Sequence, residues 1–221
     1  MKPSSRAVSR KLSLSAACLL AACASTPSGG PTPGAEGFDG ALAGWRAAST
    51  GGSGPDATWT AKADPQAVSP PNVVAMTAPS AGGEDRFNLF WTPTPAFADG
   101  RVAVAVRADG GEVDQGGGPM WRVQDANNYY LCRFNPLESN FRVYVVEDGV
   151  RRQLGTTLVI TKPGDFHRVE ATFVGDRITC AINGAVLLQV RDATIPKAGG
   201  VGLWTKADAR TSFDDFVATA K

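Results

Sequence analysis

The sequence predicts an all-β protein, a sandwich or barrel of about 12 short strands. Short apolar runs recur along the chain, and many of them alternate apolar and polar residues, which is the period of a half-buried strand. The 25 glycines and 15 prolines fall mainly between these runs, as in a turn-rich β protein. No stretch shows a convincing amphipathic helical pattern. A hydrophobic content of 43% and a charged content of 19% are typical of a globular chain.

The first residues resemble a lipoprotein signal peptide. Residues 1–11 are basic, and residues 12–22, LSLSAACLLAA, are apolar but too short to span a bilayer. The segment Leu20-Ala21-Ala22-Cys23 resembles the bacterial lipobox, in which the cysteine becomes the diacylated first residue. We therefore expect residues 1–22 to be a signal peptide and Cys23 to carry lipid. A soluble secreted protein cut near Ala22 is the alternative.

Residues 23–37 are rich in Gly, Pro, Ser and Thr and poor in apolar side chains. Such a segment cannot bury enough surface to offset its ordering entropy, so we expect a disordered tether. The membrane is then a partner through two or three acyl chains, which anchor stably. Ala24 and Ser25 follow Cys23 with no aspartate that would retain the protein at an inner membrane. The expected location is the bacterial cell envelope, at the outer membrane if the cell is Gram-negative.

Charge gives no indication of a nucleic-acid partner. Four of the 22 basic residues lie in the expected signal peptide, which holds no acid. The remaining 18 basic side chains face 21 acidic ones, so the expected mature chain is slightly acidic. A nucleic-acid-binding domain is usually strongly basic.

A single domain is expected over residues 38–221. Its first part is an edge at residues 38–45, and residues 51–70 should be irregular around Trp59 with at most one short strand. Hairpin turns are expected at Asp148-Gly149, Gly175-Asp176 and Asn183-Gly184, where the residue types tolerate positive φ. The expected strands cover residues 72–77, 86–91, 101–107, 120–124, 129–135, 141–147, 151–155, 166–174, 177–182, 185–191, 200–206 and 212–218.

Alternation along the strands assigns side chains to two faces, because successive residues of a strand point to opposite sides. The expected core face carries Trp121, Val123, Tyr130, Cys132, Phe134, Phe141, Val143, Val145, Val169, Ala171, Phe173, Ile178, Cys180 and Ile182. The opposite face of the central strands carries Arg122, Gln124, Tyr129, Leu131, Arg133, Arg142, Tyr144 and Val146. This second face is polar and rich in aromatic side chains, as in lectins and carbohydrate modules.

Residues 117–221 resemble the concanavalin A-like and laminin G-like jelly roll of bacterial secreted proteins. The resemblance lies in GGPMWRVQDANNYYLCRFNPLESNFRVYVVEDGVRRQL, in FHRVEATFVGDRITCAINGAVLLQVRDAT and in GGVGLWTKADARTSFDDF. It implies a two-sheet antiparallel β-sandwich. The same broad group holds glycan-binding modules and the 3-keto-disaccharide hydrolases, so the resemblance implies the fold more strongly than the function.

Catalytic signals are weak. Glycosidases on this sandwich carry Glu-x-Asp-x-x-Glu, and here Glu112-Val113-Asp114 begins that pattern without its final glutamate. Retaining hydrolysis needs two carboxyl groups about 5 Å apart across the sugar. The one histidine, His167, begins a strand and is expected to be structural. No catalytic residue is assigned, and a hydrolase of glucosides or (3-keto-)disaccharides remains an alternative.

The sequence also suggests a metal site and a disulfide. Asp39, Asp214 and Asp215 lie near the expected first and last strands and could contribute to a structural calcium site, although Asp214 and Asp215 should point to opposite faces. No other cofactor is expected. Cys132 and Cys180 both have core-facing parity, in a compartment that permits disulfides. They would be bridged if their strands are neighbours, and buried thiols otherwise.

The polar face is the candidate binding site. Aromatic rings stack on sugars, while Arg and Gln supply planar hydrogen-bond groups. The expected ligand-binding residues are Arg122, Gln124, Tyr129, Arg133, Arg142, Tyr144, Trp204 and Lys206. The simpler alternative is that these side chains cover a solvent-facing sheet and pair with acids. The sequence therefore favours non-catalytic binding of a glycan or polysaccharide, with a hydrolase and a structural or protein-binding envelope module as alternatives.

Overall fold

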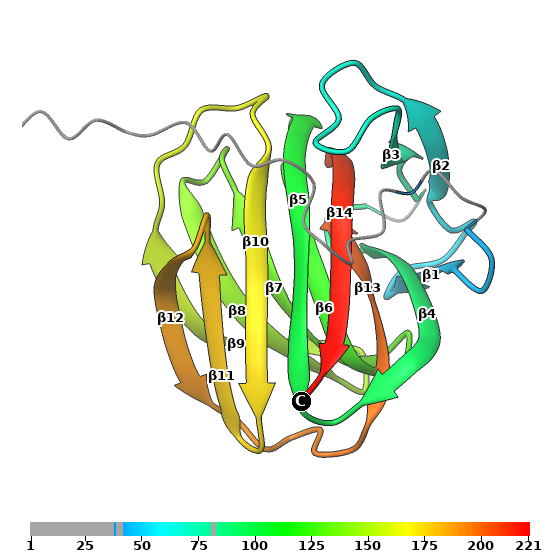
Figure 1. The fold of residues 1–221 in the computed structure, drawn as a ribbon. Coiled ribbons are helices and arrows are strands. Elements are labelled where there is room, and N and C mark those ends of the chain that lie inside the picture. Colours follow the sequence, from blue (N-terminus) through cyan, green and yellow to red (C-terminus); the bar gives the residue numbers. More distant parts are fainter. Residues whose placement is uncertain (1–37, 39–41, 81–82) are drawn as a thin grey trace, which may run out of the picture.

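The computed structural model describes residue 38, residues 42–80 and residues 83–221, so the expected signal peptide, Cys23 and the tether lie outside the described residues. Fourteen strands form two antiparallel sheets of seven, packed face to face and not closed into a barrel (Figure 1). The all-β prediction is confirmed. Among the described residues there is no helix of the length and apolarity needed to span a bilayer.

Figure 1 shows one sheet in front of the other. Sheet I runs, in spatial order, β1 (Arg46–Thr50), β4 (Phe87–Phe97), β13 (Gly199–Lys206), β6 (Gly118–Asp125), β7 (Asn128–Asn135), β8 (Asn140–Glu147) and β9 (Val150–Leu158). Sheet II, the front one, runs β12 (Ala185–Arg191), β11 (Arg177–Ile182), β10 (His167–Val174), β5 (Gly100–Gly110), β14 (Arg210–Ala220), β3 (Asn72–Ala78) and β2 (Thr58–Ala63).

The structure has two strands beyond the twelve predicted ranges: one at residues 46–50, where no strand is predicted, and one at residues 58–63, in the segment where at most one short strand is expected. Residues 46–50 and 58–63 have few large apolar side chains, and their patterns are too weak to identify both as strands. They become β1 and β2 because they add to the edges of β4 and β3, where backbone pairing stabilises them. The expected turns agree with the structure: Asn183 and Gly184 have φ of 50° and 80°, and Asp148 and Gly149 have φ of 49° and 79°. Positive φ at both central residues is the type I′ requirement.

The core between the sheets contains all but one of the side chains assigned to it by alternation. Aromatic rings fill its centre: Trp121 stacks on Tyr130 and on Phe173, with centroids 5.7 and 5.4 Å apart. The exception is Val123, which lies on the outer face of sheet I. The cause is a register shift in the β6–β7 pairing between Trp121 and Asp125, with Arg122 at φ 49°. After one irregular residue in a strand, the side chains that follow point to the opposite face of the sheet from the one that regular alternation predicts.

A second apolar cluster lies on the outer face of sheet I. Its buried members are Phe87, Leu89, Trp91, Met120, Val123, Tyr129, Leu131, Tyr144, Val146 and Trp204. A flat sheet would expose these side chains to water. Their burial requires that the sheet curves, with this outer face on the concave side.

Contacts across the sheet demonstrate the curvature. Thr50 in β1 donates to the carbonyl of Ala126 and lies 2.8 Å from the Tyr129 hydroxyl in β7, although β4, β13 and β6 lie between. The guanidinium of Arg151 in β9 lies 4.7 Å from the ring of Phe87 in β4. Five strand spacings would separate these strands by about 24 Å in a flat sheet. Sheet I is therefore strongly curved, and side chains from its two edges cover the aromatic rings on its concave face.

Candidate functional site

The concave face of sheet I is where the sequence predicts ligand binding, but its centre is closed. Tyr129 and Trp204 are completely buried. The Trp204 Nε1–H donates to the Tyr129 hydroxyl at 3.2 Å, and burial raises the pKa of Tyr129 above its usual range. Tyr144 is 3% exposed. These rings form the interior of the second cluster, so they are not an open stacking platform.

Arg122 does not lie on this face, which corrects the assignment from alternation. Its positive φ turns the side chain to the end of the sandwich, where it is 1% exposed. The guanidinium donates to three carbonyl oxygens, of Ala98 at 2.7 Å, Ile195 at 3.0 Å and Gly175 at 2.7 Å. Arg122 therefore joins three loops.

Gln124, also predicted to bind ligand, is exposed at the end of β6. Its amide donates to the carbonyls of Arg122 and Ala198 at 3.1 and 3.0 Å. These bonds tie the end of β6 to the chain that precedes β13. Gln124 is therefore separate from the concave face, although it remains reachable from solvent.

Arg133 lies on the concave face but is buried. It is 1% exposed, and its Nη2 donates to both carboxylate oxygens of Asp114 at 2.8 and 2.9 Å. Asp114 also accepts from Asn135 and is itself 1% exposed. Burial raises the pKa of Asp114, outweighing the opposite effect of the Arg133 guanidinium. The Asp of the incomplete Glu-Val-Asp motif is thus the counterion of a buried arginine.

Glu112, the other acid of that motif, is exposed and does not join Asp114. The loop that holds both is fixed by Asp208, whose carboxylate accepts from the backbone N–H groups of Glu112, Val113 and Asp114. These bonds lower the pKa of Asp208 against the effect of its burial. Asp208 thus fixes the loop through its backbone groups, and of the two acids in the motif only Asp114 has a buried, paired carboxylate.

Arg142 and Lys206 remain at the accessible end of the concave face. The Arg142 side chain is 31% exposed and donates to Glu138 at 3.1 Å and to the Tyr144 hydroxyl at 3.4 Å. The Lys206 side chain is 17% exposed, with its Nζ 3.9 Å from Asp114. The structure thus brings six of the eight predicted residues to one face, and of these six only Arg142 and Lys206 are partly exposed.

The acids proposed for calcium have other roles in the described residues. Asp39 lies outside these residues. Asp214 and Asp215 both reach Ser69, which donates its backbone N–H to Asp214 at 2.8 Å and its hydroxyl to Asp215. The expectation that the two aspartates point to opposite faces is therefore wrong, because φ of 49° at Asp215 and an irregular register redirect the side chain. Within the described part of the chain, no group of three or more His, Cys, Asp or Glu side chains could hold a metal.

Cys132 and Cys180 lie in β7 of sheet I and β11 of sheet II, so their strands are not neighbours in one sheet. Both are free thiols buried in the core between the sheets. Burial raises the pKa of Cys132, and the adjacent Cys180 thiol raises it further. In this state they act as small apolar groups, and the disulfide stays a prediction.

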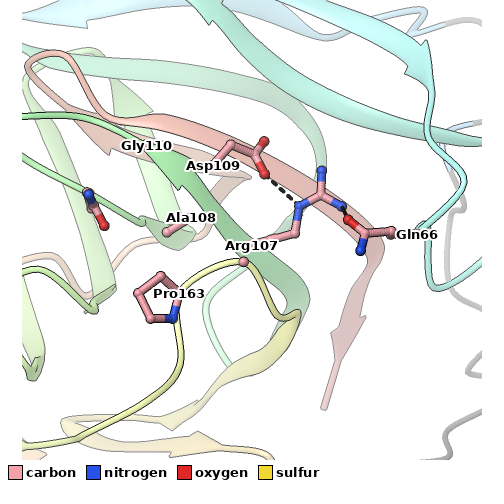
Figure 2. A pocket seen from close by; sticks show the side chains of 8 residues that line it. Gln66, Arg107, Ala108, Asp109, Gly110 and Pro163 are labelled. Atoms are coloured by element: carbon pink, nitrogen blue, oxygen red, sulfur yellow. Dashed lines mark hydrogen bonds and ion pairs between the residues drawn. The ribbon is translucent and has the colours of Figure 1, made fainter.

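An open cavity of about 390 Å³, with both polar and apolar lining, lies at the C-terminal end of β5 (Figure 2). Its charged and amide groups come from three segments: Gln66 from the β2–β3 connection, Arg107 and Asp109 from β5, and Gln115 from the β5–β6 loop. Its remaining lining is Ala108, Gly110, Pro163 and Gly164. Sequence reasoning did not find this site, because its residues are far apart in the chain and none belongs to a recognisable motif.

Arg107 organises the cavity wall. Its guanidinium is 2.5 Å from Asp64 and donates through Nε to Asp109 at 2.6 Å and through Nη1 to Gln66 at 3.3 Å. The bond from Arg107 is the largest cause of the lowered pKa of Asp64. Figure 2 shows Gln66 and Asp109 held on either side of Arg107. The wall thus presents preorganised carboxylate and amide groups to solvent.

Comparison with protein-family models and with curated proteins found no match. Solved structures with the same fold include a carbohydrate-binding module, CBM66, from Bacillus subtilis, with a TM-score of 0.62, 15% identity, and 80% of this chain and 96% of that chain covered. The cellulose-induced protein Cip1 has a TM-score of 0.60, 13% identity, and 85% and 97% coverage. A Bacillus licheniformis β-glucanase has a TM-score of 0.54, 13% identity, and 88% and 99% coverage.

These neighbours include both a carbohydrate-binding module and a glucanase, so at this identity they show the fold alone. Two sheets of seven antiparallel strands and this set of neighbours agree with the resemblance found in residues 117–221. The chain has the concanavalin A-like jelly-roll fold.

Proposed function

We propose that the protein is a lipid-anchored protein of the bacterial cell envelope whose jelly roll binds a glycan without cleaving it. The observation that carries the binding proposal is the cavity beside Arg107. Its volume of about 390 Å³ is within the range of small-molecule sites. Carboxylate and amide groups on a rigid wall match the hydroxyl groups of a sugar, each of which both donates and accepts hydrogen bonds.

The roles of the acids near the cavity support binding without cleavage. Asp64 and Asp109 both bond to Arg107, and Asp114 is buried against Arg133. A glycosidase needs one carboxyl group to donate a proton and another to attack or to activate water. These three carboxylates are held by guanidinium groups, which favours binding over acid–base chemistry.

Replacing Gln66 and Gln115 together by alanine should weaken glycan binding by roughly tenfold or more, because two hydrogen bonds to the ligand are lost. A glycan array of the full-length protein would identify a ligand, and calorimetry would measure the loss. Gln189→Ala is a matched control, since Gln189 is exposed on the opposite edge strand β12.

Equal affinity of the double variant and the wild type would contradict a glycan site in this cavity. Failure of every glycan to bind would contradict the function itself. Release of reducing sugar from the bound glycan would instead establish the hydrolase alternative.

A separate prediction tests the lipid anchor at Cys23. Replacing Cys23 by serine removes the thiol that the lipobox would acylate, so the protein should leave the membrane fraction and lose the mass of its acyl chains. Cell fractionation and intact-mass spectrometry check this, with Cys18→Ser as the control because Cys18 lies within the expected signal peptide. A Cys23→Ser protein that stays membrane-bound would contradict the lipid anchor.

A further inference from the structure

The accessible end of the concave face of sheet I holds a compact group of charges, which we call the mouth cluster. Its members are the basic residues Arg133, Arg142, Arg151 and Lys206 and the acidic residues Asp114 and Glu138. Four positive charges therefore face two negative ones. None of the six residues lines the cavity beside Arg107.

The two carboxylates are already shared among three of the cations. Asp114 accepts from Arg133 at 2.8 Å and lies 3.9 Å from the Nζ of Lys206. Glu138 accepts from Arg142 at 3.1 Å and from Arg133 at 3.4 Å. Within the described chain, these pairs leave no carboxylate in an ion pair with Arg151.

Arg151 reaches into the concave face from the edge strand β9. Its guanidinium lies over the rings of Phe87 and Tyr144, 4.7 and 4.6 Å from their centres. The Nη1 atom is buried and has no hydrogen-bond partner among the described residues. Burial lowers the pKa of Arg151, and the nearby Arg133 charge lowers it further. Cation–π contact offsets only part of the cost of burying an unpaired guanidinium.

Arg133, which is more deeply buried than Arg151, also has a guanidinium nitrogen without a hydrogen-bond partner among the described residues. Its side chain is 2% exposed, and its Nε has no partner within the part of the chain that the structure describes. Buried polar groups in folded proteins are nearly always hydrogen-bonded, so two unpaired guanidinium nitrogens in one cluster need an explanation. An anionic ligand at the solvent edge of the cluster would provide acceptors and charge to Arg151, which is less buried than Arg133.

We propose that the mouth cluster binds the oxyanion groups of an acidic polysaccharide. The shared chemistry is a carboxylate, sulfate or phosphate group, which a guanidinium recognises through parallel hydrogen bonds. The side chains of Arg142 and Glu138 are 31% and 40% exposed, so a ligand can approach from solvent. This site does not depend on the cavity beside Arg107, and either can fail without the other.

Full-length protein would be titrated by calorimetry with a polyuronate, a dextran sulfate, a glycerol-phosphate polymer and neutral dextran. We expect at least one anionic polymer to bind, neutral dextran not to bind, and the affinity to fall as salt rises from 50 to 200 mM, as charge pairing requires. The polymer that binds best identifies the oxyanion.

Arg151→Met is the test variant, because methionine keeps an apolar chain over the rings and removes the charge. Its affinity for the anionic polymer should fall about tenfold or more, the effect expected for one charge-assisted hydrogen bond. Its melting temperature should be equal to or above that of the wild type, since an unpaired buried charge is removed. Arg152→Met is the matched control, as Arg152 is the next residue and pairs with Asp192.

Three results would overturn the proposal: binding of no anionic polymer, equal losses in Arg151→Met and Arg152→Met, or unchanged affinity in Arg151→Met. If Arg151→Met proves poorly folded, Lys206→Met replaces it, with the same expected loss of affinity. The Gln66 and Gln115 double variant should leave the anionic affinity unchanged, which separates this site from the cavity.

Discussion

Replacing Arg122 by alanine is expected to lower the free energy of unfolding by about 4 kcal/mol. A loss of this size is typical when one partner of a buried charged network is removed. The guanidinium is 1% exposed and donates to three carbonyl oxygens from three loops. Alanine would leave these carbonyls without that donor in a site poorly accessible to water. Urea unfolding followed by tryptophan fluorescence measures the loss.

Gln124→Ala is the control for this prediction. Gln124 lies two residues further along β6 and also donates to two carbonyls, but it is exposed, so water can replace its bonds. Its loss should cost about 1 kcal/mol or less. A loss below about 1 kcal/mol for Arg122→Ala would show that the three loops are held by other contacts.

Replacing Asp114 by alanine should lower the free energy of unfolding by about 3 kcal/mol, because Arg133 would lose its main counterion while still buried. The exposed Glu138, 3.4 Å from Arg133, compensates only in part. Asp114→Asn retains a hydrogen-bond acceptor without the charge and should lose less. Chemical unfolding of the two variants and the wild type checks whether Asp114→Ala loses more stability than Asp114→Asn.

Glu112→Ala is the matched control for Asp114. Both residues belong to the same short loop and donate backbone N–H groups to Asp208, but the Glu112 side chain is exposed. Its replacement should change stability by no more than about 0.5 kcal/mol. If Asp114→Ala is as mild, the ion pair with Arg133 contributes little, and the buried arginine is stabilised by other groups.

The concave face shows how far alternation of residues could predict the site. Parity correctly assigns Tyr129, Arg133, Arg142 and Tyr144 to one face of sheet I, because the side-chain period of a strand is a local property. Parity cannot predict burial, since that depends on the curvature of seven strands. Contacts such as Thr50 with Tyr129 join residues 79 apart in the chain, and they convert an expected surface into a second core.

Arg122 and Asp215 were misplaced for a related reason. Each is a non-glycine residue with φ of 49° at a position where the strand register shifts. Arg rarely adopts positive φ, and Asp215 lies inside an expected strand with no glycine or turn signal beside it, so sequence reasoning continues the regular alternation through both residues. Tertiary bonds hold these conformations: the three carbonyls around Arg122, and the Ser69 hydroxyl that donates to Asp215.

The sequence by itself determined the all-β class, most of the strands, the type I′ turns and nearly all of the core between the sheets, because these follow from local periodicity and from residues that tolerate positive φ. Only the tertiary structure decided which polar residues can meet a ligand. The cavity beside Arg107 and the unpaired charge of Arg151 arise where distant segments converge, and no local pattern encodes that convergence.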